Sequence, residues 1–228
     1  MNSTNYHKAI FFDLDGVVVD TESMYQRIMM EYNRRNGLFI SERLYNDHVL
    51  GKTQKMISEF LHKEWSNNYN EITYWDGLLE FREDYIKAHG VAIKDGFEEL
   101  FAFLQKHGFY IGIVTSNSSQ FACKLLEYAG IDLKWFNAVI AREHVQRTKP
   151  FPDLYEEAVR ISGVSRNCII AIEDSSVGIQ AAIDAKINVI HVKDIAEISD
   201  ELRKKCLIDV ESLNEIKSFL SGSNYDRK

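Results

Sequence analysis

Five short runs of apolar residues recur along the chain, each bounded by polar residues or glycine. Short apolar runs without polar alternation are typical of strands that are buried on both faces of a sheet. We therefore expect strands at residues 9–12, 110–114, 138–140, 169–172 and 189–192.

Amphipathic stretches with apolar residues at helical spacing lie between the later runs, and they predict helices at residues 97–106, 120–128, 152–161 and 177–184. Gly108, Gly130 and Gly163 follow three of these stretches, where glycine commonly ends a helix. Alternation of strand and helix is typical of the α/β class. We expect a Rossmann-like core, a parallel sheet with helices on both faces.

Residues 21–91 interrupt this alternation, because they contain helical patterns but no comparable strand signal. We predict that they form an all-helical insert, with the α/β core made of residues 1–20 and 92–221 and a polar C-terminal tail at 222–228. Four aromatic residues near the middle of the insert are expected to form its core: Trp65, Tyr69, Tyr74 and Trp75.

The length of 228 residues exceeds the ~100 to 150 of a usual single domain, which fits one core plus an insert. The formal charge of −7 comes without a basic block, so the footprint of a nucleic-acid or anionic-membrane binder is missing. The chain also lacks a signal-peptide pattern and an apolar window of ~20 residues. We expect a cytoplasmic monomer that acts on a small molecule and binds neither nucleic acid nor membrane.

Carboxylates follow two of the predicted strands, Asp13 and Asp15 after the first and Glu173 and Asp174 after the fourth. The carboxyl ends of parallel strands meet at one edge of a sheet, where ligands bind. Two like charges ~4 Å apart repel by about 4 kcal/mol at an effective dielectric of ~20. A hard divalent cation relieves this repulsion, and Mg²⁺ is favoured because it binds carboxylates together with substrate phosphate oxygens.

The turn Asp13-Leu14-Asp15-Gly16 is ambiguous by itself, because helix capping and a calcium loop use similar residues. A calcium loop needs further oxygen ligands at regular spacing, and Val17 to Val19 follow here instead. The position directly after a buried strand favours a pair of catalytic carboxylates.

Hydrogen-bond donors follow the second predicted strand directly and the third at some distance. Thr115 and the backbone N–H groups of Ser116 and Asn117 can bind phosphoryl oxygens, and Lys149 adds a positive charge. Each has a simpler reading, as a helix N-cap or a solvated lysine, and Glu173 with Asp174 could also cap a helix. The joint occurrence of these residues in strand order favours a phosphate site.

With these motifs the chain resembles the haloacid dehalogenase superfamily, and within it the branch of β-phosphoglucomutase and phosphoglycolate phosphatase. The resemblance covers nearly the whole chain and implies a helical cap inserted after the first motif. It implies that Asp13 is the nucleophile that becomes an aspartyl phosphate and that Asp15 is the general acid and base. Lys149 would neutralise phosphoryl oxygens and restrain the nucleophile.

The resemblance also implies a Mg²⁺ site made by Asp13, the Asp15 carbonyl and Asp174, with Glu173 close by or acting through water. The dehalogenases of the superfamily lack the second carboxylate, since they protonate no alkoxide. Asp15 therefore indicates phosphate esters as substrates.

Within the insert, Gly51 and Lys52 stand in a loop that reaches over the active site in the relatives, so we expect both to bind substrate. A nucleotide-binding loop is excluded because Asn46 stands where its first glycine is required. A solvated lysine at a helix start is the alternative interpretation of Lys52.

Two positions separate a phosphatase from a mutase. β-Phosphoglucomutase carries a cap arginine for the second phosphate where this chain has Gln54, and a histidine where it has Tyr25. Compensation for Gln54 by Lys52 or Lys55 is the alternative interpretation. We favour a phosphatase of a small phosphorylated metabolite, with a sugar phosphate as the expected class. A phosphohexose mutase and a catalytically silent phosphate-binding protein are the alternatives.

Overall fold

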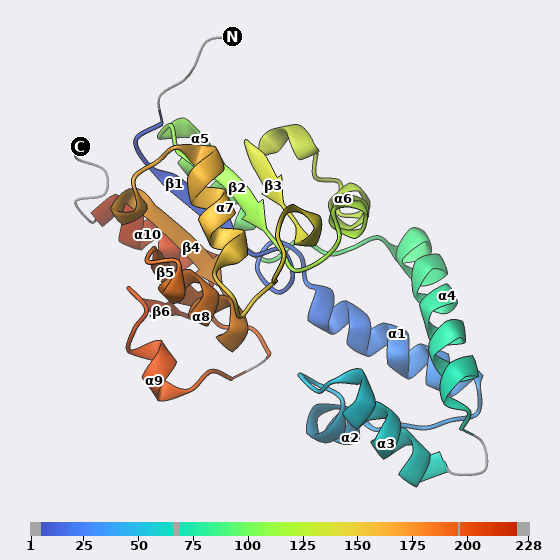
Figure 1. The fold of residues 1–228 in the computed structure, drawn as a ribbon. Coiled ribbons are helices and arrows are strands. Elements are labelled where there is room, and N and C mark those ends of the chain that lie inside the picture. The colour runs from blue at the N-terminus through green and yellow to red at the C-terminus, as the bar shows by residue number, and fades with distance from the viewer. Residues whose placement is uncertain (1–5, 66–68, 196, 223–228) are drawn as a thin grey trace. The chain divides into compact units, whose positions relative to one another are not determined.

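A computed structural model describes residues 6–65, 69–195 and 197–222 (Figure 1). The chain divides into two compact units. Residues Thr21–Val91 form one, which we call the helical unit, and the remainder of the described chain forms the α/β unit.

The α/β unit contains a six-stranded parallel sheet with the strand order β3-β2-β1-β4-β5-β6. The strands are β1 (Ala9–Phe12), β2 (Tyr110–Val114), β3 (Ala138–Ile140), β4 (Ile169–Glu173), β5 (Asn188–Val192) and β6 (Asp209–Val210). The chain builds outward from β1 on one side and then on the other, so the strand order reverses between β1 and β4. All five predicted strands are confirmed. The sixth was not predicted because two residues make no apolar run.

Six α-helices of the described chain accompany the sheet. They are α5 (Phe97–Lys106), α6 (Ser119–Tyr128), α7 (Asp153–Ser162), α8 (Ser176–Asp184), α9 (Asp200–Arg203) and α10 (Leu213–Gly222). The four predicted helices are confirmed within one residue at each end, while α9 and α10 were not predicted. Apart from Gly222, which ends α10, the predicted polar tail lies outside the described residues.

Strand β1 lies in the centre of the sheet and is buried along its whole length. Phe11 belongs to an apolar cluster that includes Leu154 of α7 and Ile179 of α8. Phe12 points to the other face, where its ring lies 5.4 Å from that of Phe97 in α5. Full burial of such a side chain stabilises the fold by about 1.5–3 kcal/mol. Packing on both faces therefore fixes the strand that carries Asp13 at its end.

The helical unit consists of four helices: α1 (Thr21–Arg35), α2 (Glu42–His48), α3 (Gln54–Trp65) and α4 (Glu71–His89). Tyr74 is buried in its core, and its hydroxyl donates to Asn33 Oδ1 at 2.9 Å. The indole of Trp75 donates to Ser58 Oγ at 2.9 Å. Trp65, Tyr69 and Trp75 pack partly buried against the same cluster, so the predicted aromatic core is confirmed.

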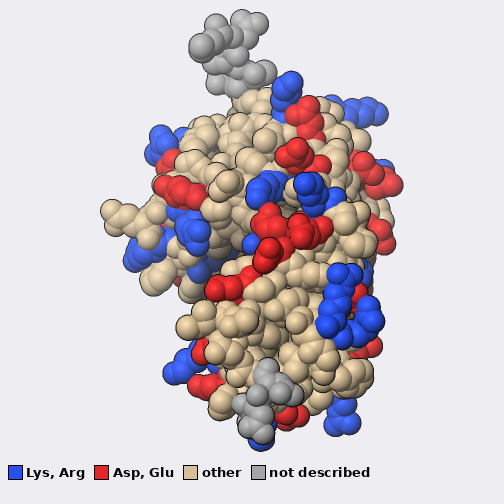
Figure 2. Space-filling view, turned by 90° about the vertical axis from the view of Figure 1, so that its right-hand side faces the viewer, with Lys and Arg blue, Asp and Glu red and all other residues tan. Residues whose placement is uncertain are grey.

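Basic and acidic side chains are interspersed on the face of the molecule in Figure 2. This mixture reflects a composition of 27 basic and 34 acidic residues. In the described ranges, every helix is too short or too polar to cross a membrane.

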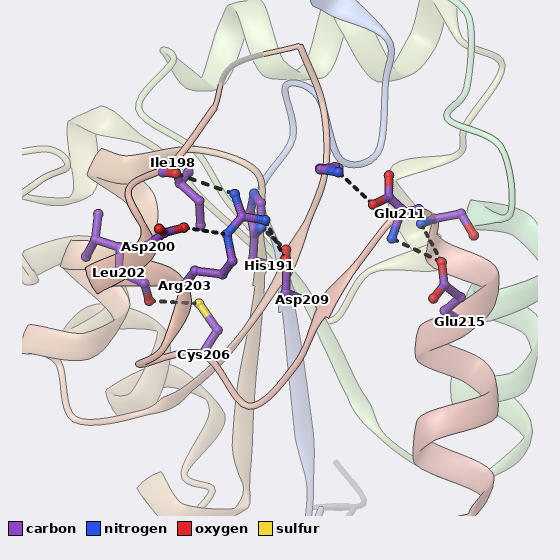
Figure 3. A network of polar contacts seen from close by, with 11 residues as sticks. His191, Ile198, Asp200, Leu202, Arg203, Cys206, Asp209, Glu211 and Glu215 are labelled. Atoms are coloured by element: carbon purple, nitrogen blue, oxygen red, sulfur yellow. Dashed lines mark hydrogen bonds and ion pairs between the residues drawn. The ribbon is translucent and has the colours of Figure 1, made fainter.

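A polar network joins β5, β6 and α9 at one side of the sheet (Figure 3). The imidazole Nδ1 of the buried His191 lies 2.5 Å from Asp209 Oδ1, and Arg203 Nη1 donates to Asp209 Oδ2 at 2.5 Å. Partial burial opposes ionisation of Asp209, but hydrogen bonds from Arg203 and His191 outweigh it and lower its pKa below the usual range. Asp209 thereby fastens the short strand β6 to its neighbours.

Replacing this carboxylate should show a pH-dependent loss of stability. We expect Asp209→Asn to lower the free energy of unfolding by about 1–3 kcal/mol at pH 7. Because the folded pKa lies below the unfolded value of ~4, the difference between the two proteins should persist above pH ~4 and vanish as the pH falls through the folded pKa. Urea denaturation at several pH values measures it, with Glu201→Gln on α9 as control. A difference independent of pH would contradict the electrostatic role of Asp209.

Candidate active site

The loop after β1 carries two carboxylates. The Asp13 N–H donates to Ile172 O at 2.9 Å, which continues the pairing of β1 with β4. The chain then turns at Gly16, whose φ of 72° lies in the left-handed region that glycine adopts without strain. Asp13 is buried and Asp15 is half-buried. The turn therefore presents both carboxylates at the carboxyl end of the central strand.

Lys149 joins the ends of three strands. Its Nζ lies 2.8 Å from Asp13 Oδ1, 2.6 Å from Glu173 Oε1 and 2.9 Å from the carbonyl oxygen of Val114. Its side chain is 4% exposed, so all three ammonium hydrogens are taken up inside the protein. Lys149 is therefore part of the site and not a solvated surface lysine.

The charges around Lys149 control its ionisation. Burial alone would lower the pKa of Lys149, but the carboxylates of Asp13 and Glu173 outweigh burial and raise the pKa above its usual value. Burial raises the pKa of Glu173, with Lys149 opposing and Asp13 reinforcing the change. Lys149 therefore stays charged. Burial of negative charge instead raises the pKa of the Glu173 carboxyl group.

Glu173 is fully buried and its two oxygens are engaged. Oε1 accepts from the Tyr155 hydroxyl at 2.5 Å as well as from Lys149, and Oε2 accepts from Ser175 Oγ at 3.3 Å. A Cβ on Gly178 would overlap this carboxylate, so only glycine leaves room for it. Because both oxygens of Glu173 have protein partners, these contacts suit Glu173 to hold Lys149 in position better than to bind a cation directly.

The carboxylates of Asp13, Glu173 and Asp174 each offer an oxygen within 4.8 Å of the others. Together with the charged Lys149 they leave two formal negative charges in a buried site. Burial raises the pKa of Asp174 well above its usual value, and Asp13 and Glu173 reinforce that rise. Hard oxygen donors and a charge of minus two fit one divalent cation such as Mg²⁺.

The loop after β2 contributes Thr115, Ser116 and Asn117. Thr115 is buried, and its Oγ1 accepts from the Asn117 N–H at 3.1 Å. The side-chain Nδ2 of Asn117 donates to Asp15 Oδ2 at 2.6 Å. The Asn117 N–H thus closes a turn inside the loop, and its binding of phosphate stays a prediction. Ser116 is exposed at the turn.

Gly51 and Lys52 belong to the helical unit and are exposed there. Both line a hollow of about 330 Å³ within that unit, together with Tyr25, Trp75 and Arg82. Gly51 has a φ of 66°, and the Lys52 N–H donates to Val49 O at 3.0 Å. A compact turn therefore holds the two predicted substrate-binding residues at the hollow.

Two residues near the carboxylates, Tyr155 and Asp194, were not predicted. Tyr155 of α7 has the spacing of an apolar core residue, so its hydroxyl gave no separate signal. Asp194 follows β5, and its Oδ1 lies 2.7 Å from Lys94 Nζ. The position of Asp194 just after the fifth apolar run is the signal that could have indicated it, since the other carboxylates also follow strands.

Comparison with known proteins adds independent information. A family model described as haloacid dehalogenase-like hydrolase matches residues 10–192. The chain is similar to hexitol phosphatase A of Escherichia coli (strain K12), with 29% identity covering 83% of this chain and 85% of the relative. It is also similar to a phosphorylated carbohydrates phosphatase of Thermotoga maritima, with 24% identity covering 81% and 84%.

Among solved structures, a β-phosphoglucomutase from Clostridium difficile resembles the chain with a TM-score of 0.68. The identity is 22%, and the match covers 96% of this chain and 97% of that one. The predicted fold class, a Rossmann-like parallel sheet with an inserted helical unit, is confirmed.

Removal of the buried ammonium group tests the charge balance of the site. We expect Lys149→Met to lower the free energy of unfolding by about 3–5 kcal/mol, because it leaves buried carboxylates uncompensated. The matched control is Lys193→Met, which breaks the exposed pair with Glu211 and should cost about 0–1 kcal/mol. Denaturant titration of both variants measures the difference. Equal small losses would show that Lys149 compensates no buried charge.

Proposed function

The chain belongs to the haloacid dehalogenase-like hydrolases, as its motifs predicted, and from this premise we propose that it hydrolyses phosphate monoesters of small phosphorylated carbohydrates. The observation that carries the proposal is the buried contact of Asp13 Oδ1 with Lys149 Nζ at 2.8 Å, beside a cluster of carboxylates. A nucleophile restrained by a charged lysine at the end of the central strand suits attack on phosphorus.

In the proposed reaction, an oxygen of the Asp13 carboxylate attacks the phosphorus atom and the bond to the ester oxygen breaks. The leaving alkoxide takes the proton of the Asp15 carboxyl group, which leaves an aspartyl phosphate on Asp13. A water molecule then gives a proton to Asp15 and attacks the phosphorus, releasing inorganic phosphate and restoring the Asp13 carboxylate. A covalent intermediate divides one difficult displacement into two easier ones.

Asp15 suits the acid and base role because its orientation is fixed. The Asn117 amide donates to Asp15 Oδ2 at 2.6 Å, which directs the carboxyl group within the turn. A positioned general acid contributes roughly 10²- to 10⁴-fold to the rate of such a step. The loop after β2 therefore positions Asp15, while Thr115, Ser116 and Asn117 remain candidates for binding the phosphoryl oxygens.

The proposal includes Mg²⁺ as cofactor, held by Asp13, Asp174 and the Asp15 carbonyl. When bound, Mg²⁺ supplies positive charge that offsets the carboxylates and the transferred phosphoryl group. Glu173 contacts the Lys149 ammonium group and keeps it in position against Asp13.

The substrate class follows from the relatives and from the helical unit. Two similar proteins are a hexitol phosphatase and a phosphorylated carbohydrates phosphatase. The hollow of the helical unit offers an aromatic side chain, Trp75, and the basic Lys52 and Arg82, which suit a hydroxylated anion. We assign substrate selection to this unit as a cap, with Gly51 and Lys52 as contacts. The proposed enzyme is a cytoplasmic monomer that requires neither nucleic acid nor membrane.

Loss of the nucleophile should abolish turnover. With Mg²⁺ and a panel of sugar and hexitol phosphates, we expect Asp13→Asn to release inorganic phosphate at least ~10³-fold more slowly than the unaltered chain. Asp184→Asn, an exposed carboxylate of α8, is the matched control and should retain full activity. Near-normal turnover by Asp13→Asn would reject the proposed nucleophile. Absence of turnover by the unaltered chain, despite Mg²⁺ binding, would favour a silent binding protein.

A mutase assay separates the second enzyme class. Supplied with a hexose 1-phosphate and the corresponding bisphosphate, the protein should release inorganic phosphate without forming the 6-phosphate isomer. The reason is that Gln54 cannot replace the charge and fork of an arginine at the second phosphate. Phosphorus NMR of the products distinguishes the two outcomes. Formation of the isomer as main product would reject the phosphatase assignment.

A further inference from the structure

Asp194 is a fifth carboxylate at the carboxyl end of the sheet. It follows β5, which pairs in parallel with β4, the strand that ends in Glu173. The Asp194 side chain is 5% exposed, and Lys94 Nζ donates to its Oδ1 at 2.7 Å. One oxygen of this buried carboxylate is thus fixed by a cation.

The other oxygen has no such partner. Asp194 Oδ2 is buried and has no hydrogen-bond partner in the described part of the chain. A buried acceptor left without a donor costs about 1–3 kcal/mol. A hydrogen-bond donor from outside the protein would satisfy Asp194 Oδ2 and remove this cost.

The direction of Oδ2 identifies where that donor lies. Asp194 Oδ2 lies 2.7 Å from the point that a Cβ on Gly16 would occupy. An oxygen of the Asp174 carboxylate lies close to the same point. The two carboxylates thus face each other across Gly16. A hydrogen-bond donor that is bound to a cation would offset the repulsion between these two carboxylates.

We propose that Asp194 is an outer ligand of the metal site, with Oδ2 accepting a hydrogen bond from a water molecule bound to the cation that Asp174 holds. This inference rests on the metal site of the proposed function. Mg²⁺ keeps several of its waters when it binds protein carboxylates, so donors are available around it. Among the described residues, the tight group of possible ligand atoms includes Asp174 and leaves out Asp194, which fits a contact through water.

Lys94 gives the proposal a second, opposite consequence. Its ammonium group fixes Asp194 and also partly cancels the negative charge that attracts the cation. Removal of Asp194 should therefore weaken Mg²⁺ binding, whereas removal of the Lys94 charge should strengthen it. A pair that served only to stabilise the fold would not produce opposite effects on metal affinity.

The test is isothermal titration of the full chain with MgCl₂ in the absence of substrate. We expect Asp194→Asn to raise the Kd for Mg²⁺ by about 10- to 100-fold, the usual effect of removing an outer-shell partner. Lys94→Met should lower the Kd several-fold, and the exposed control Glu211→Gln should leave it unchanged. An unchanged Kd in Asp194→Asn, or weaker binding in both Asp194→Asn and Lys94→Met, would overturn the inference.

The same titration separates this inference from the proposed function. If the unaltered chain binds no Mg²⁺, both the metal cofactor and the role of Asp194 are rejected. If it binds Mg²⁺ and needs it for turnover, but Asp194→Asn binds equally well, only the role of Asp194 is rejected. Circular dichroism checks the fold of each variant. If Asp194→Asn does not fold, the sign of the change in Lys94→Met still decides the question.

Discussion

The buried contact of Lys149 with Asp13 and Glu173 is the interaction on which the rest of the site depends. A lysine that is 4% exposed keeps its charge only if carboxylates surround it, and a fully buried glutamate needs the lysine in turn. Tyr155 adds a donor to Glu173, and the packing of β1 on both faces keeps Asp13 in reach. The contact of Lys149 with Asp13 and Glu173 is therefore stabilised by the sheet, by helix α7 and by the balance of charges.

This arrangement carries more negative than positive charge. Backbone glycines lie beside the carboxylates, because only a residue without a Cβ leaves room for them. A side chain at Gly16 would collide with Asp174, and one at Gly178 would collide with Glu173. Close approach of backbone to carboxylate keeps the site small, and a small site with two uncompensated charges suits a divalent cation better than a monovalent one. The fold and the proposed cofactor therefore meet the same electrostatic requirement.

The sequence predicted those features that depend on a local pattern. Apolar runs indicated β1 to β5, and carboxylates directly after β1 and β4 indicated the site. Features that depend on tertiary contacts were not predicted. Tyr155 has the spacing of a core residue, and its hydroxyl contact with Glu173 appears only in the folded structure. The two-residue strand β6 contains no apolar run and is held by the contacts of Asp209. Asp194 was visible after β5, yet its relation to Asp174 exists only in three dimensions.

The central claim is that Asp13 carries the phosphoryl group during turnover, and trapping the phosphoenzyme tests it most directly. Asp15→Asn should slow the second displacement, because water then lacks its general base. The variant is given acetyl phosphate and Mg²⁺, because the acetate leaving group needs no general acid and the first displacement can still proceed. Acid quenching followed by peptide mass spectrometry locates any phosphoryl group. We expect phosphate on Asp13. Release of inorganic phosphate with the phosphoryl group on another residue, or on none, would contradict the claim.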